Sequence, residues 1–88
     1  MVKAYVLIKT QCGLVDEVLK EILEMTIVEE AHKVFGAFNI VAEVRARDME
    51  AIVDVIIGKM RKIEGMVDTQ SLLVVDAELD LLSTTMAN

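Results

Sequence analysis

Hydrophobic and polar residues alternate over Val2–Thr10, which is the spacing of a β-strand. Both faces of this predicted strand carry apolar side chains, so both faces are expected to be covered. We therefore expect helices on one face of the sheet and another surface, such as a second sheet, on the other. One face holds Val2, Ala4, Val6 and Ile8, and the other holds Lys3, Tyr5, Leu7 and Lys9.

Two segments change from alternation to the four-residue spacing of an amphipathic helix. The first helix is predicted over residues 13–24. The second runs from Asp48, its predicted N-cap, to Gly65, which is expected to end it. Charged residues occupy the opposite face of each helix. The apolar positions are Leu14, Val18 and Ile22 in the first helix, and Ile52, Ile56 and Met60 in the second.

Three further strands complete the pattern. Residues 27–35 and 40–46 are predicted to form a hairpin that turns at Gly36, and residues 67–75 form the last strand. Residues 76–88 are weakly patterned, which leaves a short helix and a frayed tail both open. The element order predicts an α+β, ferredoxin-like βαββαβ sandwich. It has a four-stranded antiparallel sheet with two helices on one face.

Size and composition favour association between chains. A chain of 88 residues buries only a modest share of its surface when it folds alone, and 55% of these residues are apolar. The core must be aliphatic, because the chain holds no Trp, two Phe and one Tyr. Two helices leave one sheet face uncovered, where Tyr5, Leu7 and Val41 are predicted to lie. We therefore predict a homodimer that pairs two sheets face to face.

The charge balance argues against nucleic acid as a direct partner. The formal net charge is −6, from 15 acidic and 9 basic residues, which opposes binding to phosphate groups. The nearest basic cluster, Lys59, Arg61 and Lys62, is interpreted as cations at the end of a helix. The sequence contains neither a signal segment nor a run of eighteen apolar residues. We expect a cytoplasmic protein that binds no membrane.

Candidate chemistry is sparse. His32 is the only histidine and Cys12 the only cysteine, and neither has a partner at a metal-binding or catalytic spacing. We predict no enzyme activity, no metal site and no cofactor. Gly36–Asn39 is more informative, because a glycine, an aromatic ring and a side-chain amide together suit a pocket for a small polar ligand. From the residues alone, a hairpin turn with a packed Phe38 explains the same segment.

The motifs from Ala4 to Asp76 resemble the effector-binding domain of the Lrp/AsnC, or feast/famine, transcription regulators. Gly36-Ala37-Phe38-Asn39 resembles that family's glycine, any residue, aromatic, aspartate turn, with Asn39 in the aspartate position. Phe35 stands where a small polar residue commonly precedes the glycine. Gly65-Met66-Val67 and Thr69-Gln70-Ser71 resemble its glycine-valine turn and its Thr-x-Thr or Thr-x-Ser strand.

The resemblance implies a stand-alone effector-binding domain over residues 1–76, with a tail over 77–88, because the family's helix-turn-helix has no counterpart in this sequence. Such a module is expected to regulate transcription or amino-acid metabolism without binding DNA itself. Its implied partners are an amino acid, further copies of itself in dimers and rings, typically octamers, and full-length regulators of the family. The implied ligand-binding residues are Phe35, Gly36, Ala37, Phe38, Asn39, Thr69 and Ser71.

Two alternatives stay open. The same sheet-paired architecture occurs in small dimeric enzymes, such as cofactor-free monooxygenases and isomerases, for which only His32 and Tyr5 are available as inward-facing chemical groups. The same element order also occurs in allosteric modules of metabolic enzymes, of which the ACT domain is the example.

Overall fold

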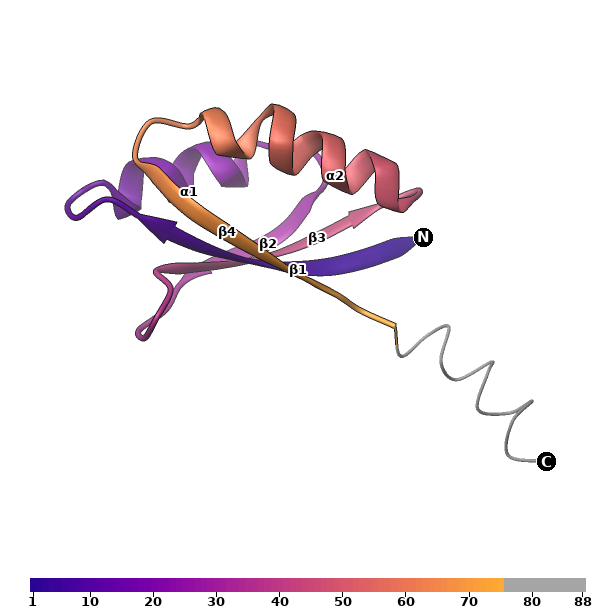
Figure 1. Cartoon of the computed structure of the whole chain (residues 1–88), viewed down its shortest axis with the longest axis horizontal. Coiled ribbons are helices and arrows are strands. Elements are labelled where there is room, and N and C mark those ends of the chain that lie inside the picture. Colours follow the sequence, from indigo (N-terminus) through magenta and orange to yellow (C-terminus); the bar gives the residue numbers. More distant parts are fainter. Residues whose placement is uncertain (76–88) are drawn as a thin grey trace.

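The computed structural model describes residues 1–75 (Figure 1). The four strands form one antiparallel sheet in the order β2-β3-β1-β4, and both helices lie on the same face of it. This arrangement confirms the predicted ferredoxin-like βαββαβ order. The predicted short helix or frayed tail lies outside the described residues. The elements are β1 (Val2–Thr10), α1 (Val15–Leu23), β2 (Val28–Lys33), β3 (Ile40–Ala46), α2 (Met49–Gly58), the 3₁₀ turn η1 (Met60–Lys62) and β4 (Met66–Leu73).

The core lies between the sheet and the two helices, and it is aliphatic as the composition predicts. The inward face of β1 is buried from Ala4 to Thr10, whereas Tyr5 on its other face remains 37% exposed. The alternation seen in the sequence therefore assigned the two faces of β1 correctly. The buried residues are Ala4, Val6, Ile8, Val18, Ile22, Ala31, Ile40, Ala42, Val44, Ala46, Ile52, Ile56, Met60 and Ile63.

The second helix is shorter than the sequence predicts. It begins after Asp48, whose carboxylate accepts a hydrogen bond from the Ala51 amide at 2.9 Å, so the predicted N-cap is confirmed. The helix ends at Gly58, and the chain continues in η1 before it turns at Gly65. The apolar spacing misled the prediction because Met60 and Ile63 stay buried in this irregular segment. Buried residues recur every three to four positions in an α-helix and every three in a 3₁₀ turn, so the two spacings are hard to tell apart in a sequence.

The bounds of α1, β2 and β4 also differ from the predictions, and β4 runs over Met66–Leu73 rather than over residues 67–75. Helix α1 begins at Val15 rather than at residue 13, because the Leu14 amide donates to the Gln11 carbonyl at 3.1 Å and closes a turn first. Strand β2 covers only Val28–Lys33 and contains an irregular register between Val28 and Glu30. An extra residue at such a bulge shifts the alternation, which explains why this strand alternates poorly in the sequence.

Gly65 connects η1 to β4 directly beneath the start of α1. Its φ is +95°, and a Cβ atom there would lie 2.9 Å from Leu14 Cδ1 and 3.3 Å from Val18 Cγ2. Its carbonyl accepts a hydrogen bond from the Gln11 amide at 2.8 Å. A residue without a side chain is therefore required for both its conformation and its contacts.

The face of the sheet opposite the helices is open within the described residues. Tyr5 lies opposite Leu72 of β4, and Leu7 lies opposite Val41 of β3, so apolar groups occupy its centre. Lys3 pairs with Glu43 at 2.6 Å and lies 5.5 Å from the centre of the Tyr5 ring. This hydrogen-bonded pair raises the pKa of Lys3 and lowers the pKa of Glu43. The open face therefore combines an apolar centre with a charged pair, Lys3 and Glu43, beside it.

Candidate functional site

The connection between β2 and β3 forms a short loop over Val34–Asn39. The Val34 amide donates to the Asn39 carbonyl at 2.9 Å, which closes the base of the loop. Gly36 has a φ of +150°, a conformation that residues with side chains rarely adopt. The Phe35 side chain is 107% exposed, so it is a large apolar group that no described residue covers.

Asn39 connects the end of this loop to β1. Its amide donates to the Ile8 carbonyl at 2.8 Å, and its Oδ1 accepts a hydrogen bond from the amide of Thr10 at 2.9 Å. The Thr10 hydroxyl lies 3.5 Å from the same oxygen. An aspartate could accept both of these hydrogen bonds. The asparagine differs from an aspartate in its second polar atom. Its Nδ2 group donates hydrogen bonds, whereas the second oxygen of a carboxylate accepts them.

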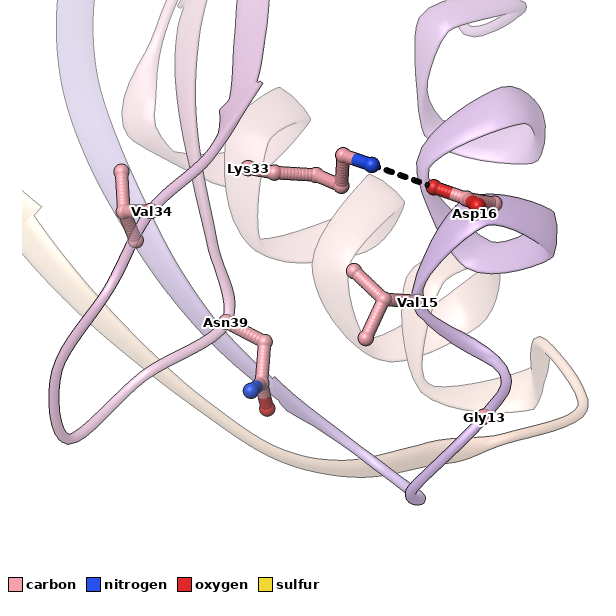
Figure 2. Close-up of a pocket in the computed structure, with 6 residues that line it drawn as sticks. All are labelled: Gly13, Val15, Asp16, Lys33, Val34 and Asn39. Atoms are coloured by element: carbon pink, nitrogen blue, oxygen red, sulfur yellow. Dashed lines mark ion pairs between the residues drawn. The ribbon is translucent and has the colours of Figure 1, made fainter.

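A cavity of about 360 Å³ lies where the loop approaches the start of α1 (Figure 2). The turn before α1 and the first residues of that helix form one side, and the end of β2 with the loop that follows it forms the other. Figure 2 shows Lys33 and Asp16 reaching toward each other across it. The lining residues are Gly13, Val15, Asp16, Lys33, Val34 and Asn39.

One ion pair spans this cavity. Lys33 Nζ lies 2.9 Å from Asp16 Oδ1, and both side chains are more than half exposed. The hydrogen bond to Asp16, together with the charge of Asp16, raises the pKa of Lys33 above its ordinary value of 10.5. Lys33 therefore stays protonated at neutral pH. An exposed pair of this kind adds little to stability, so both groups can exchange partners with a charged ligand.

The start of α1 offers a second charged feature. The N-cap residue is Leu14, which provides no side-chain hydrogen bond to the first amides of the helix. Unpaired amides at a helix start attract anions because they point outward and add to the positive end of the helix dipole. Val15 and Asp16 are the first residues of this helix, and both line the cavity.

The structure places the predicted ligand-binding residues in two regions. Asn39 lines the cavity, and Phe35, Gly36, Ala37 and Phe38 form the loop beside it. Thr69 and Ser71 lie on β4, opposite Ile8 and Val6 of β1, and they do not line the cavity. Strand β1 separates them from β3, so a single chain does not bring all seven residues together.

Sequence reasoning missed most of the cavity. Gly13, Val15, Asp16, Lys33 and Val34 were not predicted as site residues. One signal was available for Lys33, which is two residues beyond the buried Ala31 and therefore points to the helix side of the sheet. A lysine on the helix side of a strand is unusual and therefore marks a place to look for an anionic partner or a ligand.

The remaining candidate groups lie on the surface. His32 is exposed and contacts Glu30 at 3.3 Å, and the free thiol of Cys12 is exposed in the turn before α1. Within residues 1–75, no three His, Cys, Asp or Glu side chains gather as a metal site would require. Over the same residues, no helix has the length and hydrophobicity needed to span a membrane.

Comparisons with solved structures find the same fold in several proteins. A protein from Thermus thermophilus, TTHA0845, is 34% identical with a TM-score of 0.81, over 84% of this chain and 92% of that one. Escherichia coli AsnC is 24% identical with a TM-score of 0.80, and the match covers 84% of this chain but only 50% of that one. A Neisseria meningitidis transcriptional regulator, solved as its L-Met complex, is 16% identical with a TM-score of 0.75. The match covers 83% of this chain and 49% of that one.

The family comparison agrees with the fold. A search of curated proteins finds no match. A family model described as the Lrp/AsnC ligand binding domain matches residues 3–80, which is most of the chain. The structure, with two helices on one face of a β2-β3-β1-β4 sheet, is the one shared by the regulators above. The chain belongs to the Lrp/AsnC ligand-binding domain family.

Proposed function

We propose that this chain is an amino-acid effector-binding and oligomerisation module that regulates transcription or amino-acid metabolism without itself binding DNA. The observation that carries the proposal is the cavity between α1 and the β2–β3 loop, with opposite charges on Lys33 and Asp16. An α-amino acid carries the same two charges on neighbouring groups. The cavity is thus complementary to the part that all amino acids share.

Each group of the cavity has a role in this proposal. Lys33 and the uncapped start of α1 bind the ligand's carboxylate, because both present positive potential. Asp16 binds the ligand's ammonium group, and Asn39 Nδ2 donates a further hydrogen bond. Val15 and Val34 contact the ligand's side chain. The volume of about 360 Å³ lies near the small end of the range for ligand pockets, which suits one amino acid.

The comparison with N. meningitidis supports the ligand class. That regulator was solved as a complex with L-Met, and its fold matches this chain with a TM-score of 0.75. The cavity of this chain would select which amino acid binds, and in it Asn39 replaces the family's aspartate. The replacement removes one negative charge that an ammonium group would otherwise meet.

The proposal includes assembly through the open sheet face. Tyr5, Leu7 and Val41 would be buried there by a second chain, and Lys3 and Glu43 beside them are already paired, which lowers the penalty for burying these two charges. Dimers of this kind would join in a ring, typically an octamer. Thr69 and Ser71, together with the exposed Phe35, would then meet the cavity region of a neighbouring chain.

Assembly and ligand binding would be linked in such a ring. A ligand that contacts two dimers stabilises the ring relative to free dimers by its difference in affinity for the two states. The acidic net charge of −6 supports an indirect role, through mixed assembly with full-length regulators in the cytoplasm, rather than direct contact with DNA.

A thermal-shift and calorimetric screen with the twenty standard amino acids tests this proposal. We expect at least one to bind and to raise the melting temperature, because a ligand at one hundred times its Kd stabilises a protein by about 2.7 kcal/mol. Lys33→Met and Asp16→Asn should each weaken binding of that amino acid. Lys62→Met is the matched control, because Lys62 is also an exposed lysine, lies in η1 and does not line the cavity.

Two results would contradict the proposal. One is the absence of a shift with every amino acid at millimolar concentration. The other is a ligand whose affinity falls equally in Lys33→Met and in Lys62→Met, since that would indicate a general charge effect rather than binding in the cavity. Asn39→Asp gives a further readout, because it keeps the acceptor for Thr10 and alters only the group that faces the ligand.

A further inference from the structure

Asn39 leaves one polar group of the cavity without a partner. Its Oδ1 accepts a hydrogen bond from the Thr10 amide at 2.9 Å, and this contact fixes which way the side-chain amide is turned. The remaining polar atom is Nδ2, which donates no hydrogen bond to any residue within 1–75. Because Asn39 lines the cavity and is only half-buried, Nδ2 is a hydrogen-bond donor that is available to a ligand (Figure 2).

The side-chain acceptors of the cavity are already engaged, whereas donors remain. Asp16 Oδ1 lies 2.9 Å from Lys33 Nζ, and Asn39 Oδ1 accepts from the Thr10 amide. A lysine ammonium group has three N–H donors, so its contact with Asp16 leaves two of them for a ligand. The cavity as it stands therefore offers N–H groups from Lys33 and Asn39 to a ligand that is rich in acceptors.

An α-amino acid and the α-keto acid with the same side chain differ in one group. Both carry the carboxylate that Lys33 attracts. The ammonium group of the amino acid shares Asp16 with Lys33 or displaces it, and it cannot accept a hydrogen bond from Asn39 Nδ2. The keto oxygen of the keto acid is an acceptor, and it needs no negative charge nearby. A keto acid thus leaves the ion pair between Asp16 and Lys33 intact.

We propose that the cavity takes α-keto acids as a second class of ligand, with the carboxylate on Lys33 and the keto oxygen on Asn39 Nδ2. The proposal rests on the proposed function for the location of the site and goes beyond it in the class of ligand. Val15 and Val34 contact the remainder of the ligand, so the members of the class that fit are those with aliphatic side chains.

Asn39 determines the specificity for this second class. An aspartate at position 39 would keep the acceptor for Thr10 but would place a second, anionic oxygen where Nδ2 lies. That oxygen would repel a keto acid and attract an ammonium group. Because amino-group transfer interconverts an amino acid and its α-keto acid, a module that binds both in one cavity responds to their ratio.

Calorimetric titration of the full-length chain with matched trios of ligands tests the proposal. Each trio holds an α-keto acid, the amino acid with the same side chain, and the carboxylate that lacks both groups. The trios are pyruvate, alanine and propionate; α-ketobutyrate, α-aminobutyrate and butyrate; and α-ketoisocaproate, leucine and isocaproate. We expect at least one keto acid to bind about fivefold more tightly than its unsubstituted carboxylate, because its oxygen accepts a hydrogen bond from Nδ2.

Two variants should move the two classes of ligand in opposite directions. Asn39→Asp should weaken keto-acid binding by about tenfold or more, whereas amino-acid binding should hold or rise. Asp16→Asn removes the carboxylate that pairs with the ammonium group, so it should weaken amino-acid binding and strengthen keto-acid binding. Lys33→Met should weaken both classes. Lys62→Met, outside the cavity, should weaken neither.

Circular dichroism confirms that each variant is folded, and Asp16 and Lys33 are exposed, so their variants keep the test valid if Asn39→Asp does not fold. Three results would each overturn this inference and leave the proposed function standing. They are binding of amino acids but of no keto acid, keto acids that bind no more tightly than their unsubstituted carboxylates, and equal losses of both classes in Asn39→Asp. Binding of keto acids without any amino acid would support the inference and contradict the proposed function.

Discussion

Helices α1 and α2 cover the same face of one sheet, yet different parts of the two helices are exposed to solvent. Helix α1 leaves one large apolar side chain exposed, Leu23, and has an N-terminus that no side chain caps. Helix α2 is capped by Asp48 and exposes Met49, Val53 and Ile57 along its side. The difference shows a division of roles. The end of α1 suits a small anionic group, and the side of α2 suits another protein surface.

Both helices contribute side chains to the core. Truncating these side chains should have the largest effects on the free energy of unfolding. Ile22→Ala under α1 and Ile52→Ala under α2 should each lower the free energy of unfolding by about 2–5 kcal/mol, because both side chains are buried. Leu23→Ala is the control and should change it by less than about 0.5 kcal/mol. Urea unfolding at one fixed protein concentration measures all three. A loss at Ile22 or Ile52 as small as that at Leu23 would contradict the shared role.

The contact beneath the start of α1 has no counterpart under α2. Gly65→Ala should lower the free energy of unfolding by about 1–3 kcal/mol more than Gly13→Ala does, because its new Cβ would press on Leu14 and Val18. Gly13 shares the positive φ, at +87°, but a Cβ there meets open space. Urea midpoints of the two variants provide the measurement. Equal losses would show that backbone conformation alone matters at Gly65.

The cap distinguishes the two helix starts directly. Asp48→Ala should lower the free energy of unfolding by about 1 kcal/mol, because the Ala51 amide loses its acceptor. Asp48→Asn keeps an acceptor and should lose less. Hydrogen exchange at the Ala51 amide should accelerate in Asp48→Ala. Unchanged exchange would mean that this cap does not hold the start of α2 in solution.

The smallest expected effect concerns the ion pair at the start of α1. Because Asp16 raises the pKa of Lys33 above 10.5, the pair's contribution to stability is present below that pH. It is lost as the pH rises through the pKa of Lys33 in the folded protein. In an NMR titration, Asp16→Asn should return the pKa of Lys33 to its ordinary value. Glu17→Gln, in the same turn, should leave it unchanged, and equal shifts would rule out a specific pair.

Local patterns predicted the fold well because its periods are regular. The alternation over Val2–Thr10 and over 40–46 gave both strands at their observed bounds, and the acceptor at Asp48 gave the start of α2. The end of α2 was not predicted, since Met60 and Ile63 continue the apolar spacing in an irregular segment. Strand β2 was predicted too long, because a bulge interrupts its alternation.

The site was less accessible to sequence reasoning because its contacts join distant segments. Asp16 and Lys33 meet only when α1 packs over β2, and nothing in the local sequence of either residue indicates the other. Asn39 was predicted as a ligand residue, and its hydrogen bond to Thr10 adds a structural role that depends on the register of β1 and β3. The separation of Thr69 and Ser71 from the cavity likewise follows from strand order.

The central claim is that an amino acid controls the assembly of this chain. Sedimentation velocity over a dilution series, with and without the amino acid that binds most tightly in the screen, tests it most directly. We predict that the ligand shifts dissociation of the assembly to lower protein concentration, because it stabilises the assembled state. A chain that stays monomeric at all concentrations, or one whose dissociation is the same with every amino acid, would contradict the account.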